Sequence, residues 1–335
     1  MKVLYLGNKF KSYKKISSTL ETLEPLLSEF CEIKTASGKK NQILRAMEMF
    51  RFYWVYGIRA DKIMIDVFST RAFYFAYFFT SLSAFFDKRY ILILHGGNLP
   101  YRYTISRKKM NTMLCKADTI IAPSAYLQQF FSERGYNIRL IPNIINLNEY
   151  IFRERSIIRP KLLSIRGFGK PYNPLMTIKA VECLIIKYPE IRLLILGNSE
   201  EHYYNEVVNY INEKNLNPYV MIEPKMSKAD WINMSKDYDI MISNPIIDNS
   251  PVSIIEGMAL GMCVISTKVG GVSYLVSEKE CALIESNNEK VLSEAIEKLL
   301  CDFNYAKNLS TNGRLMAEKY DWGNIKNLWE KVLLK

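Results

Sequence analysis

The chain has 335 residues, of which 49% are hydrophobic and 24% charged, and this composition excludes a disordered or low-complexity protein. Its length exceeds the ~250 to 300 residues that one hydrophobic core supports, which predicts two domains. The net charge of +11 lies in residues 1–150, with 22 Lys and Arg against 11 Asp and Glu, whereas residues 151–335 hold 23 of each; this asymmetry predicts an anionic partner for the first half.

The first half alternates apolar strands with helical segments. Largely apolar segments at 3–6, 62–67 and 90–97 are typical of parallel strands covered on both faces. The N-terminal apolar run is too short for a signal peptide, so we expect a cytoplasmic chain. Residues 72–86 are apolar but shorter than the ~20 residues that span a bilayer, and the sequence leaves open whether they are buried or touch a membrane.

The second half repeats this alternation after a polar segment at 146–160, where we place the linker. Its predicted strands lie at 161–167, 191–198, 219–224, 238–245 and 262–271, followed by a helix over 310–334. We therefore predict an α/β protein with domains at 1–152 and 153–312 and a C-terminal helix at 313–335. Open sheets of this kind bind ligands at the carboxyl ends of their strands, so we expect a cleft between two such sheets.

The segment DNSPVSIIEGMALGMCVISTKVGGV, residues 248–272, places two acids around a predicted helix start. Ser250 suits the N-cap and Pro251 the first helical position. The amides at this helix start suit a phosphate. Ser253 and Glu256 share one face of the helix, so Glu256 is predicted to face the cleft rather than the core.

This segment resembles the donor-site motif of the retaining glycosyltransferases of family 4, which have the GT-B fold: two Rossmann-like, doubly wound parallel-sheet domains facing a cleft. The first acid of the family motif is Glu where this chain has Asp248, and the family usually has a Pro-containing turn at Met262. The resemblance implies that Glu256 binds the ribose hydroxyls of a nucleotide sugar and that Asp248 lies beside the donor sugar. The structural alternatives are that Glu256 is a solvated residue of the helix and that Asp248 is a loop residue that initiates a turn.

A second match lies in SIRGFGKPYNP, where the family carries an Arg and a Lys that clasp the donor diphosphate in place of a metal. These would be Arg166 and Lys170, one residue closer together than in most members. Two surface cations in a Gly-rich loop are the alternative. The donor-binding residues implied by the resemblance are Arg166, Lys170, Asn249, Ser250, Pro251, Val252, Ser253 and Glu256.

In the first domain, LHGGNLP at 94–100 places His95 at the end of a strand. The resemblance suggests that His95 contacts the donor sugar or the reaction centre, although a histidine at a strand end is often structural. The catalytic candidates are thus Asp248 and His95. The residues of a possible reaction-centre loop are Gly7, Asn8, Gly96 and Gly97.

Metal and redox chemistry find little support in the sequence. The acids Asp237 and Asp239 precede an apolar strand, whereas an Asp-x-Asp metal motif should follow one, and no other ligand cluster or cysteine pair is present. The dinucleotide-binding and P-loop fingerprints are absent. We predict a metal-independent enzyme without a cofactor, which uses a nucleotide diphosphate sugar as substrate.

The basic first half combines its charge with aromatic segments at 50–57 and 72–79 and a lysine-rich loop at 8–15. Such a combination suits the anionic inner surface of the cytoplasmic membrane. Nucleic-acid binding is the rival explanation, but no nucleic-acid-binding module is recognisable, and we predict no nucleic-acid partner.

The resemblance implies sugar transfer to a hydroxyl of a lipid-linked glycan in surface-polysaccharide biosynthesis, such as that of capsule or lipopolysaccharide. It also implies that the C-terminal helix crosses back to the first domain. Asp248 and the shortened Arg-to-Lys spacing motivate one alternative, a catalytically degenerate protein that acts as a sugar-binding or scaffold subunit.

Overall fold

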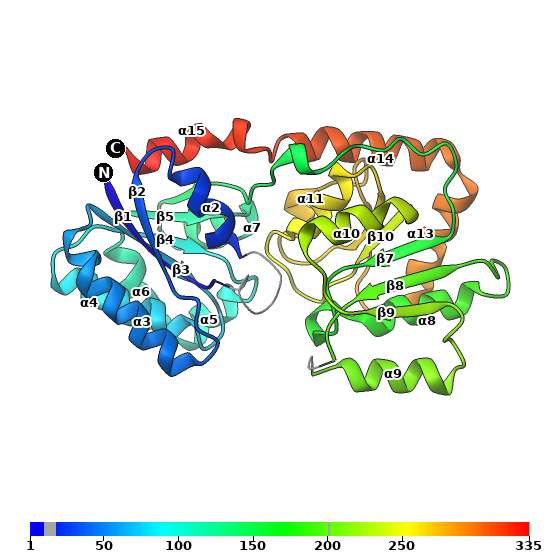
Figure 1. The fold of residues 1–335 in the computed structure, drawn as a ribbon, viewed down its shortest axis with the longest axis horizontal. Helices are drawn as coiled ribbons and strands as arrows, with labels where there is room; N and C mark the ends of the chain where they lie inside the picture. Colours follow the sequence, from blue (N-terminus) through cyan, green and yellow to red (C-terminus); the bar gives the residue numbers. More distant parts are fainter. Residues whose placement is uncertain (10–17, 200–201, 335) are drawn as a thin grey trace. The chain divides into compact units, whose positions relative to one another are not determined.

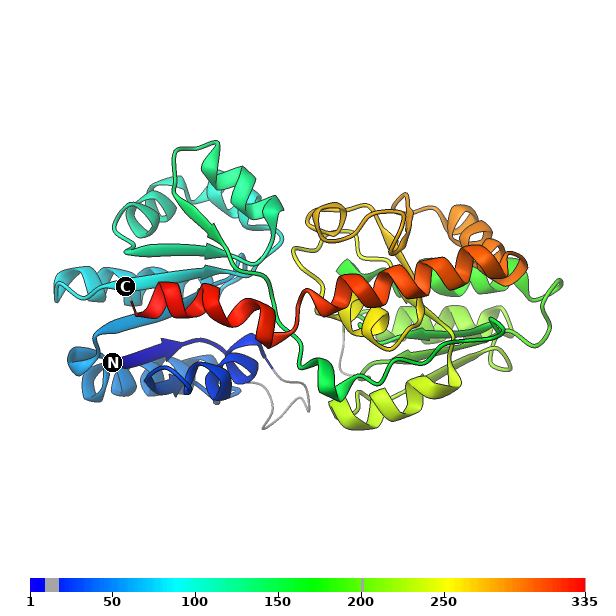
Figure 2. The ribbon, with the colours of Figure 1, turned by 90° about the horizontal axis from the view of Figure 1, so that it is seen from above.

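The computed structural model describes residues 1–9, 18–199 and 202–334. The chain forms two compact units: unit 1 comprises Met1–Ile144 and Trp322–Lys335, and unit 2 comprises Ile145–Asp321. Each unit contains one six-stranded, fully parallel sheet with helices packed against it (Figures 1 and 2). None of the helices in the described ranges combines the length and apolarity that a membrane span requires.

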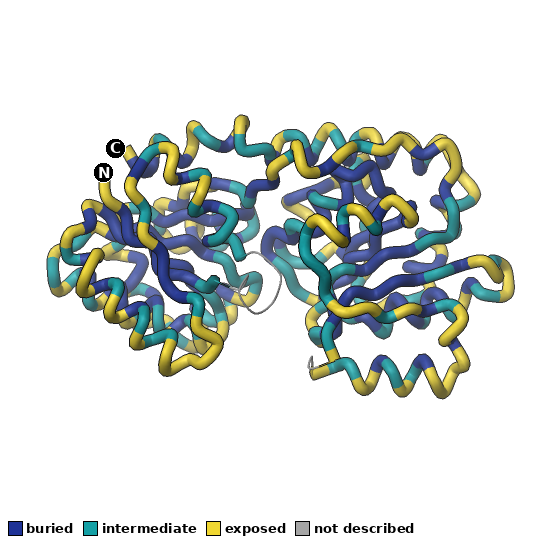
Figure 3. Tube along the Cα trace, viewed as in Figure 1, coloured by how far each residue is buried: buried dark blue, intermediate teal, exposed yellow. Residues whose placement is uncertain are grey.

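Unit 1 has the strand order β2-β1-β3-β4-β5-β6. Its strands are β1 Lys2–Leu6, β2 Glu32–Ala36, β3 Lys62–Val67, β4 Tyr90–Leu94, β5 Thr119–Ala122 and β6 Ile138–Leu140. Its helices are α2 Thr19–Leu27, α3 Gln42–Val55, α4 Phe73–Phe85, α5 Leu99–Ile105, α6 Arg107–Cys115, α7 Ala125–Ser132 and α15 Trp322–Leu333, with the 3-10 turn η1 Gly57–Arg59. The central strands β3 and β4 are buried along their whole length, which explains their continuous apolar sequences (Figure 3).

Unit 2 has the strand order β12-β11-β10-β7-β8-β9. Its strands are β7 Lys161–Ser164, β8 Arg192–Leu196, β9 Val220–Glu223, β10 Ile240–Ser243, β11 Cys263–Thr267 and β12 Ala282–Ile284. Its helices are α8 Pro174–Leu184, α9 Tyr204–Glu213, α10 Lys228–Met234, α11 Val252–Ala259, α12 Val272–Leu275, α13 Glu289–Cys301 and α14 Phe303–Glu318, with 3-10 turns η2 Leu147–Glu149, η3 Lys170–Tyr172 and η4 Ser235–Asp237. The sequence predicted this repeated α/β pattern.

The units meet in sequence at 144/145 and 321/322, whereas the sequence placed the boundaries after 152 and 312. The first difference arises because the buried ring of Tyr150 packs near Trp231 of α10, with 6.5 Å between ring centroids. The second arises because α14 continues past 312, and Gly313 lies directly against Met258. The single helix expected over 310–334 is therefore two helices, α14 and α15.

Helix α15 packs within unit 1 through an apolar face that includes Ile325 and Trp329. At its end, Lys62 Nζ donates a 2.8 Å hydrogen bond to the carbonyl of Val332. At its start, Trp322 Nε1 donates to Glu29 Oε1 at 3.1 Å. Residues distant in sequence thus complete the first unit.

The apolar segment 72–86 largely coincides with α4, which is buried on one face and exposed on the other. Its buried residues are Phe73, Ala76, Phe79, Thr80 and Ser83, and its exposed large apolar residues are Tyr74, Phe78 and Phe85. One face of α4 belongs to the core of unit 1, and the other face is accessible.

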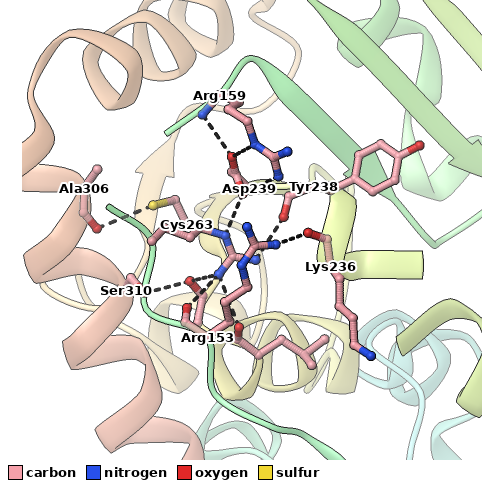
Figure 4. A network of polar contacts seen from close by, with 11 residues as sticks. Arg153, Arg159, Lys236, Tyr238, Asp239, Cys263, Ala306 and Ser310 are labelled. Atoms are coloured by element: carbon pink, nitrogen blue, oxygen red, sulfur yellow. Dashed lines mark hydrogen bonds and ion pairs between the residues drawn. The ribbon is translucent and has the colours of Figure 1, made fainter. Parts of the chain in front are cut away.

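A buried ion-pair network fixes the segment that leads into β7 (Figure 4). The carboxylate of Asp239 is fully buried and accepts from Arg155 Nε at 2.8 Å and from Arg159 Nε at 2.7 Å. Burial opposes ionisation of Asp239, but the hydrogen bonds from Arg159 and Arg155 outweigh it, so the pKa of Asp239 lies below its usual value. Arg155 also donates to the carbonyl of Gly261 at 2.5 Å, which ties this segment to the end of α11.

Candidate functional site

The motif segment of unit 2 forms a tight loop between β10 and α11. Asn249 and Ser250 are buried in it. The glycine pair in VGGV explains how the loop is held: a Cβ added at Gly271 would lie 1.5 Å from the carbonyl oxygen of Asn249. Gly271 N donates to the Asp248 carbonyl at 3.0 Å, and Gly270 has a φ of +50°, which favours glycine. The two glycines therefore permit the close approach that shapes the loop.

Helix α11 begins at Val252, one residue later than the sequence predicted. Pro251 has extended backbone angles and is the N-cap residue, so the assignment of Ser250 as N-cap was wrong. Pro251 gives the first turn no side-chain cap. Val252 is half-buried, whereas Ser253 is buried.

Arg166 and Asp248 form an ion pair at the start of α11. Arg166 Nη2 lies 2.6 Å from Asp248 Oδ2, and the two side chains are 22% and 13% exposed. Arg166 Nη1 lies 3.5 Å from Ser253 Oγ, and the guanidinium stands 4.4 Å from the centre of the Tyr172 ring. Among the residues that the structure describes, the buried Nε of Arg166 has no hydrogen-bond acceptor. The predicted donor residues Arg166, Asp248 and Ser253 therefore come together.

Lys170 takes a different position. It opens the turn η3 after the same loop and is exposed. Its backbone carbonyl accepts from Asn173 N at 3.2 Å, but its ammonium group makes no hydrogen bond or ion pair with another described residue. Arg166 thus lies in a cluster with Asp248 and Ser253, whereas Lys170 lies at the surface.

Glu256 lies on the first turns of α11 with 14% of its side chain exposed. Its Oε1 accepts a 2.6 Å hydrogen bond from the hydroxyl of Tyr150, and Lys228 Nζ stands 4.0 Å from the same oxygen. Burial raises the pKa of Glu256 above its usual value, and the Tyr150 hydrogen bond, Lys228 and Arg166 act in the opposite direction. The carboxylate is thus partly desolvated and held by donors.

In unit 1, His95 follows β4 and is joined to an acid that sequence reasoning missed. His95 Nε2 lies 2.7 Å from Asp66 Oδ1, and Tyr5 donates to the same oxygen at 2.8 Å. The ring of Phe68 stacks on the imidazole with 5.3 Å between centroids. The side chains of His95 and Asp66 are 7% and 3% exposed, so this is a buried constellation.

Of the predicted loop residues, Gly7 lies against this constellation and Gly96 follows His95 directly. A Cβ at Gly7 would lie 2.2 Å from Asp66 Oδ2, and one at Gly96 would lie 2.7 Å from the Ser69 nitrogen, so both positions need glycine for space. Gly97 lies in the turn before α5. Asn8 accepts a 3.0 Å hydrogen bond from Arg45 Nη1.

The geometry of unit 2 agrees with what sequence comparison finds. Residues 152–316 match the family model described as glycosyl transferases group 1. This match covers most of unit 2. An uncharacterized glycosyltransferase of Methanocaldococcus jannaschii is 25% identical over 239 residues, which are 70% of this chain and 64% of that relative. The chain thus spans less than two thirds of the relative's length.

Solved structures match the whole chain at low identity. Sucrose-phosphate synthase from Thermosynechococcus elongatus has a TM-score of 0.82 at 15% identity and covers 100% of this chain and 99% of its own. HepE from Anabaena, in complex with UDP-glucose, has a TM-score of 0.76 at 17% identity and covers 99% of each chain. The fold is GT-B, which confirms the predicted fold class.

Sequence reasoning missed the partners of the predicted residues. Asp66 carried a readable signal, since it is an acid inside the otherwise apolar strand KIMIDV. Tyr150 carried none, because it lies just before the matched group 1 segment and was assigned to a linker. Within residues 1–9, 18–199 and 202–334, no three histidine, cysteine or acidic side chains are grouped so that they could hold a metal ion.

Proposed function

We propose that the protein is a retaining glycosyltransferase of family 4 that moves a sugar from a nucleotide diphosphate sugar to a hydroxyl of a lipid-linked glycan in surface-polysaccharide biosynthesis. One observation carries the proposal: Arg166, Asp248 and Glu256 converge around the start of α11, inside a group 1 domain. The solved complex of HepE with UDP-glucose supports a nucleotide sugar as the donor.

The residues of unit 2 suit two parts of such a donor, the anionic diphosphate and the polar ribose. The buried Nε of Arg166 needs an acceptor, and the first turn of α11 presents backbone amides, so a diphosphate would satisfy both. The carboxylate of Glu256 would accept hydrogen bonds from the two ribose hydroxyls. Lys170, exposed on the same loop, would approach the diphosphate from solvent.

In the proposed reaction, the bond between the sugar's anomeric carbon and the diphosphate breaks with its electron pair going to the diphosphate. The acceptor oxygen bonds to the anomeric carbon on the face that the diphosphate leaves, and its proton passes to a diphosphate oxygen. Arg166 and the α11 amides stabilise the charge that develops on the leaving group. Asp248 holds Arg166 in place, and His95 would contact the donor sugar. This scheme needs no protein nucleophile.

The proposal is tested by a thermal-shift screen of nucleotide sugars, followed by assay of nucleoside diphosphate release. A true donor binds the folded state and raises the melting temperature. It should also be hydrolysed slowly to free nucleoside diphosphate when no acceptor is present. Stabilisation without any release would instead support the sugar-binding or scaffold alternative, which the group 1 match does not favour.

We also propose that unit 1 docks on the anionic inner face of the cytoplasmic membrane, where a lipid-linked acceptor would lie. Helix α3 exposes an apolar stripe, defined by Ile43, Met47, Phe50 and Trp54, which are 71%, 62%, 46% and 53% exposed. Their spacing puts them on one helix face, and the first half of the chain carries the whole positive excess. The lysine-rich loop at 8–15 falls mostly outside the described residues.

Sedimentation with phosphatidylglycerol-containing vesicles tests this docking. Wild-type protein should bind at low ionic strength and dissociate as salt is added. Phe50→Ser with Trp54→Ser should lower the bound fraction, whereas Ile186→Ser, at a 93% exposed site of unit 2, should not. Wild-type protein that ignores such vesicles at low salt would contradict the docking proposal.

A further inference from the structure

Three residues of unit 2 lie around the carboxylate of Glu256, and together with it they form what we call the Tyr150 cluster: Glu149, Tyr150, Lys228 and Glu256. Tyr150 donates to Glu256 Oε1 at 2.6 Å. Lys228 Nζ lies 2.9 Å from Glu149 Oε2, 4.0 Å from Glu256 Oε1 and 4.9 Å from the centre of the Tyr150 ring. Three separate segments therefore meet at one carboxylate: η2 with its C-cap residue, α10 and α11.

We infer that Tyr150 is a positioning residue for the nucleotide, because its hydroxyl fixes Oε1 of Glu256 and leaves Oε2 to accept from the sugar hydroxyls. This inference rests on the proposed role of Glu256 in ribose binding. Tyr150 itself is 1% exposed, so it acts through Glu256 rather than on the nucleotide. In the described part of the chain, Glu256 Oε2 accepts no hydrogen bond.

The main chain of Tyr150 is held next to α11 by a side chain of α14, Arg314. Arg314 Nη1 donates to the carbonyl of Tyr150 at 2.9 Å and to the carbonyl of Ala259 at 2.8 Å. One guanidinium nitrogen therefore binds the main chain of Tyr150 and the last turn of α11. A cation at the carboxyl end of a helix is also favourable for the helix dipole. The distance between the hydroxyl of Tyr150 and Glu256 is thereby set by the scaffold.

The charges around Glu256 give the cluster a pH-dependent signature. Burial raises the pKa of Glu256, the Tyr150 hydroxyl, Lys228 and Arg166 lower it, and Glu149 raises it. Burial and the nearby Glu256 also raise the pKa of Tyr150 well above its usual value, so its hydroxyl keeps its proton and remains a donor. A protonated Glu256 accepts hydrogen bonds poorly, so nucleotide affinity should fall as the pH drops through the pKa of Glu256.

The test measures the affinity of UDP, GDP and ADP by calorimetry from pH 5 to 8 and follows the tightest of them. Tyr150→Phe removes only the hydroxyl, and we expect ~10-fold weaker binding near neutral pH. The acid limb of the affinity profile should move to higher pH, because Glu256 loses a donor that favours its charged form. Lys228→Met should move the acid limb in the same direction while keeping the Tyr150 hydrogen bond.

The chain provides a matched control in Tyr210, whose hydroxyl donates to Glu182 while Lys214 Nζ lies 3.6 Å from that carboxylate. Tyr210→Phe should leave both the affinity and its pH profile unchanged. If Glu256→Ala lowers the affinity as expected while Tyr150→Phe alters neither affinity nor pH profile, the inference about Tyr150 fails and the donor-site assignment is retained. If no nucleoside diphosphate binds the wild type, or Glu256→Ala binds normally, the proposed function fails with it.

Discussion

The His95–Asp66 pair of unit 1 and the Arg166–Asp248 pair of unit 2 differ in whether neighbouring residues satisfy their hydrogen-bonding groups. In unit 1, one carboxylate oxygen of Asp66 forms hydrogen bonds with both the His95 imidazole and the Tyr5 hydroxyl, and the carboxylate is almost fully buried. In unit 2, Arg166 is 22% exposed and keeps a buried nitrogen without an acceptor among the described residues. The unit 1 constellation thus holds one imidazole, whereas the unit 2 constellation leaves a buried nitrogen that the proposed diphosphate would satisfy.

The largest effect is expected from Glu256→Ala. Removing the carboxylate deletes the acceptor proposed for two hydroxyls, so the affinity for the preferred nucleoside diphosphate should fall by ~100-fold. Calorimetry measures the affinity, and the melting temperature reports whether the variant is folded. Glu182→Ala, which also removes a tyrosine-bonded carboxylate of unit 2, should bind normally. Wild-type affinity in a folded Glu256→Ala would sink the donor-site assignment.

Arg166→Leu should separate the diphosphate from the rest of the nucleotide. Loss of the guanidinium removes charge-assisted hydrogen bonds to phosphate, so we expect ~30-fold weaker binding of the diphosphate and little change for the nucleoside. Arg192→Leu is the control, because Arg192 also stands over a tyrosine ring, 5.5 Å from the centre of Tyr219, and pairs with no carboxylate of the described residues. Equal losses for nucleoside and diphosphate would place Arg166 outside the diphosphate site.

Asp66→Asn should affect turnover rather than nucleotide affinity. The carboxylate selects which imidazole nitrogen of His95 carries the proton, and an amide can present the wrong group to it, so we expect the turnover rate to fall by about tenfold. Steady-state kinetics and calorimetry of the same preparation separate the two quantities. A large loss of nucleotide affinity with normal turnover would contradict this prediction, because Asp66 would then act in nucleotide binding rather than in turnover.

The smallest effect is expected from Arg159→Met, which tests the scaffold of unit 2 away from the site. The variant leaves Asp239 with the Arg155 guanidinium and the backbone N–H of residue 159. Because the Arg159 side chain is 42% exposed, we expect a loss of only about 1 kcal/mol in the free energy of unfolding at pH 7.

The same variant has a defined pH dependence. The pKa of Asp239 is lowered on folding, so its stabilisation is present above its unfolded pKa and is lost as the pH falls through the folded value. Urea unfolding should show the difference between wild type and Arg159→Met shrinking in strong acid. If the difference in the free energy of unfolding stayed the same in strong acid, the loss would come from packing rather than from the ion pair. If Arg159→Met changed the nucleotide affinity, the ion-pair network would be coupled to the donor site.

Much of the fold could be predicted because its signals are local. Apolar runs such as KIMIDV and YILIL read as buried parallel strands, and both strands are buried throughout. The boundary after 152 differed from the structure because Tyr150 is buried by residues far away in sequence. The Ser250 cap was misassigned because a proline with extended backbone angles can itself precede the first helical turn.

The apolar pattern alone predicts two α/β units, each with a sheet of parallel strands, and a helix that begins beside one acid and carries another. The partner of each acid is known only from the folded chain: Asp248 pairs with Arg166, 82 residues away, and Glu256 accepts from Tyr150, 106 residues away. Local spacing fixes which face of a helix a side chain occupies, because the helix repeat is constant. The groups that meet that face depend on strand order and on the packing of α10, α11 and α14, which no short segment of the sequence encodes.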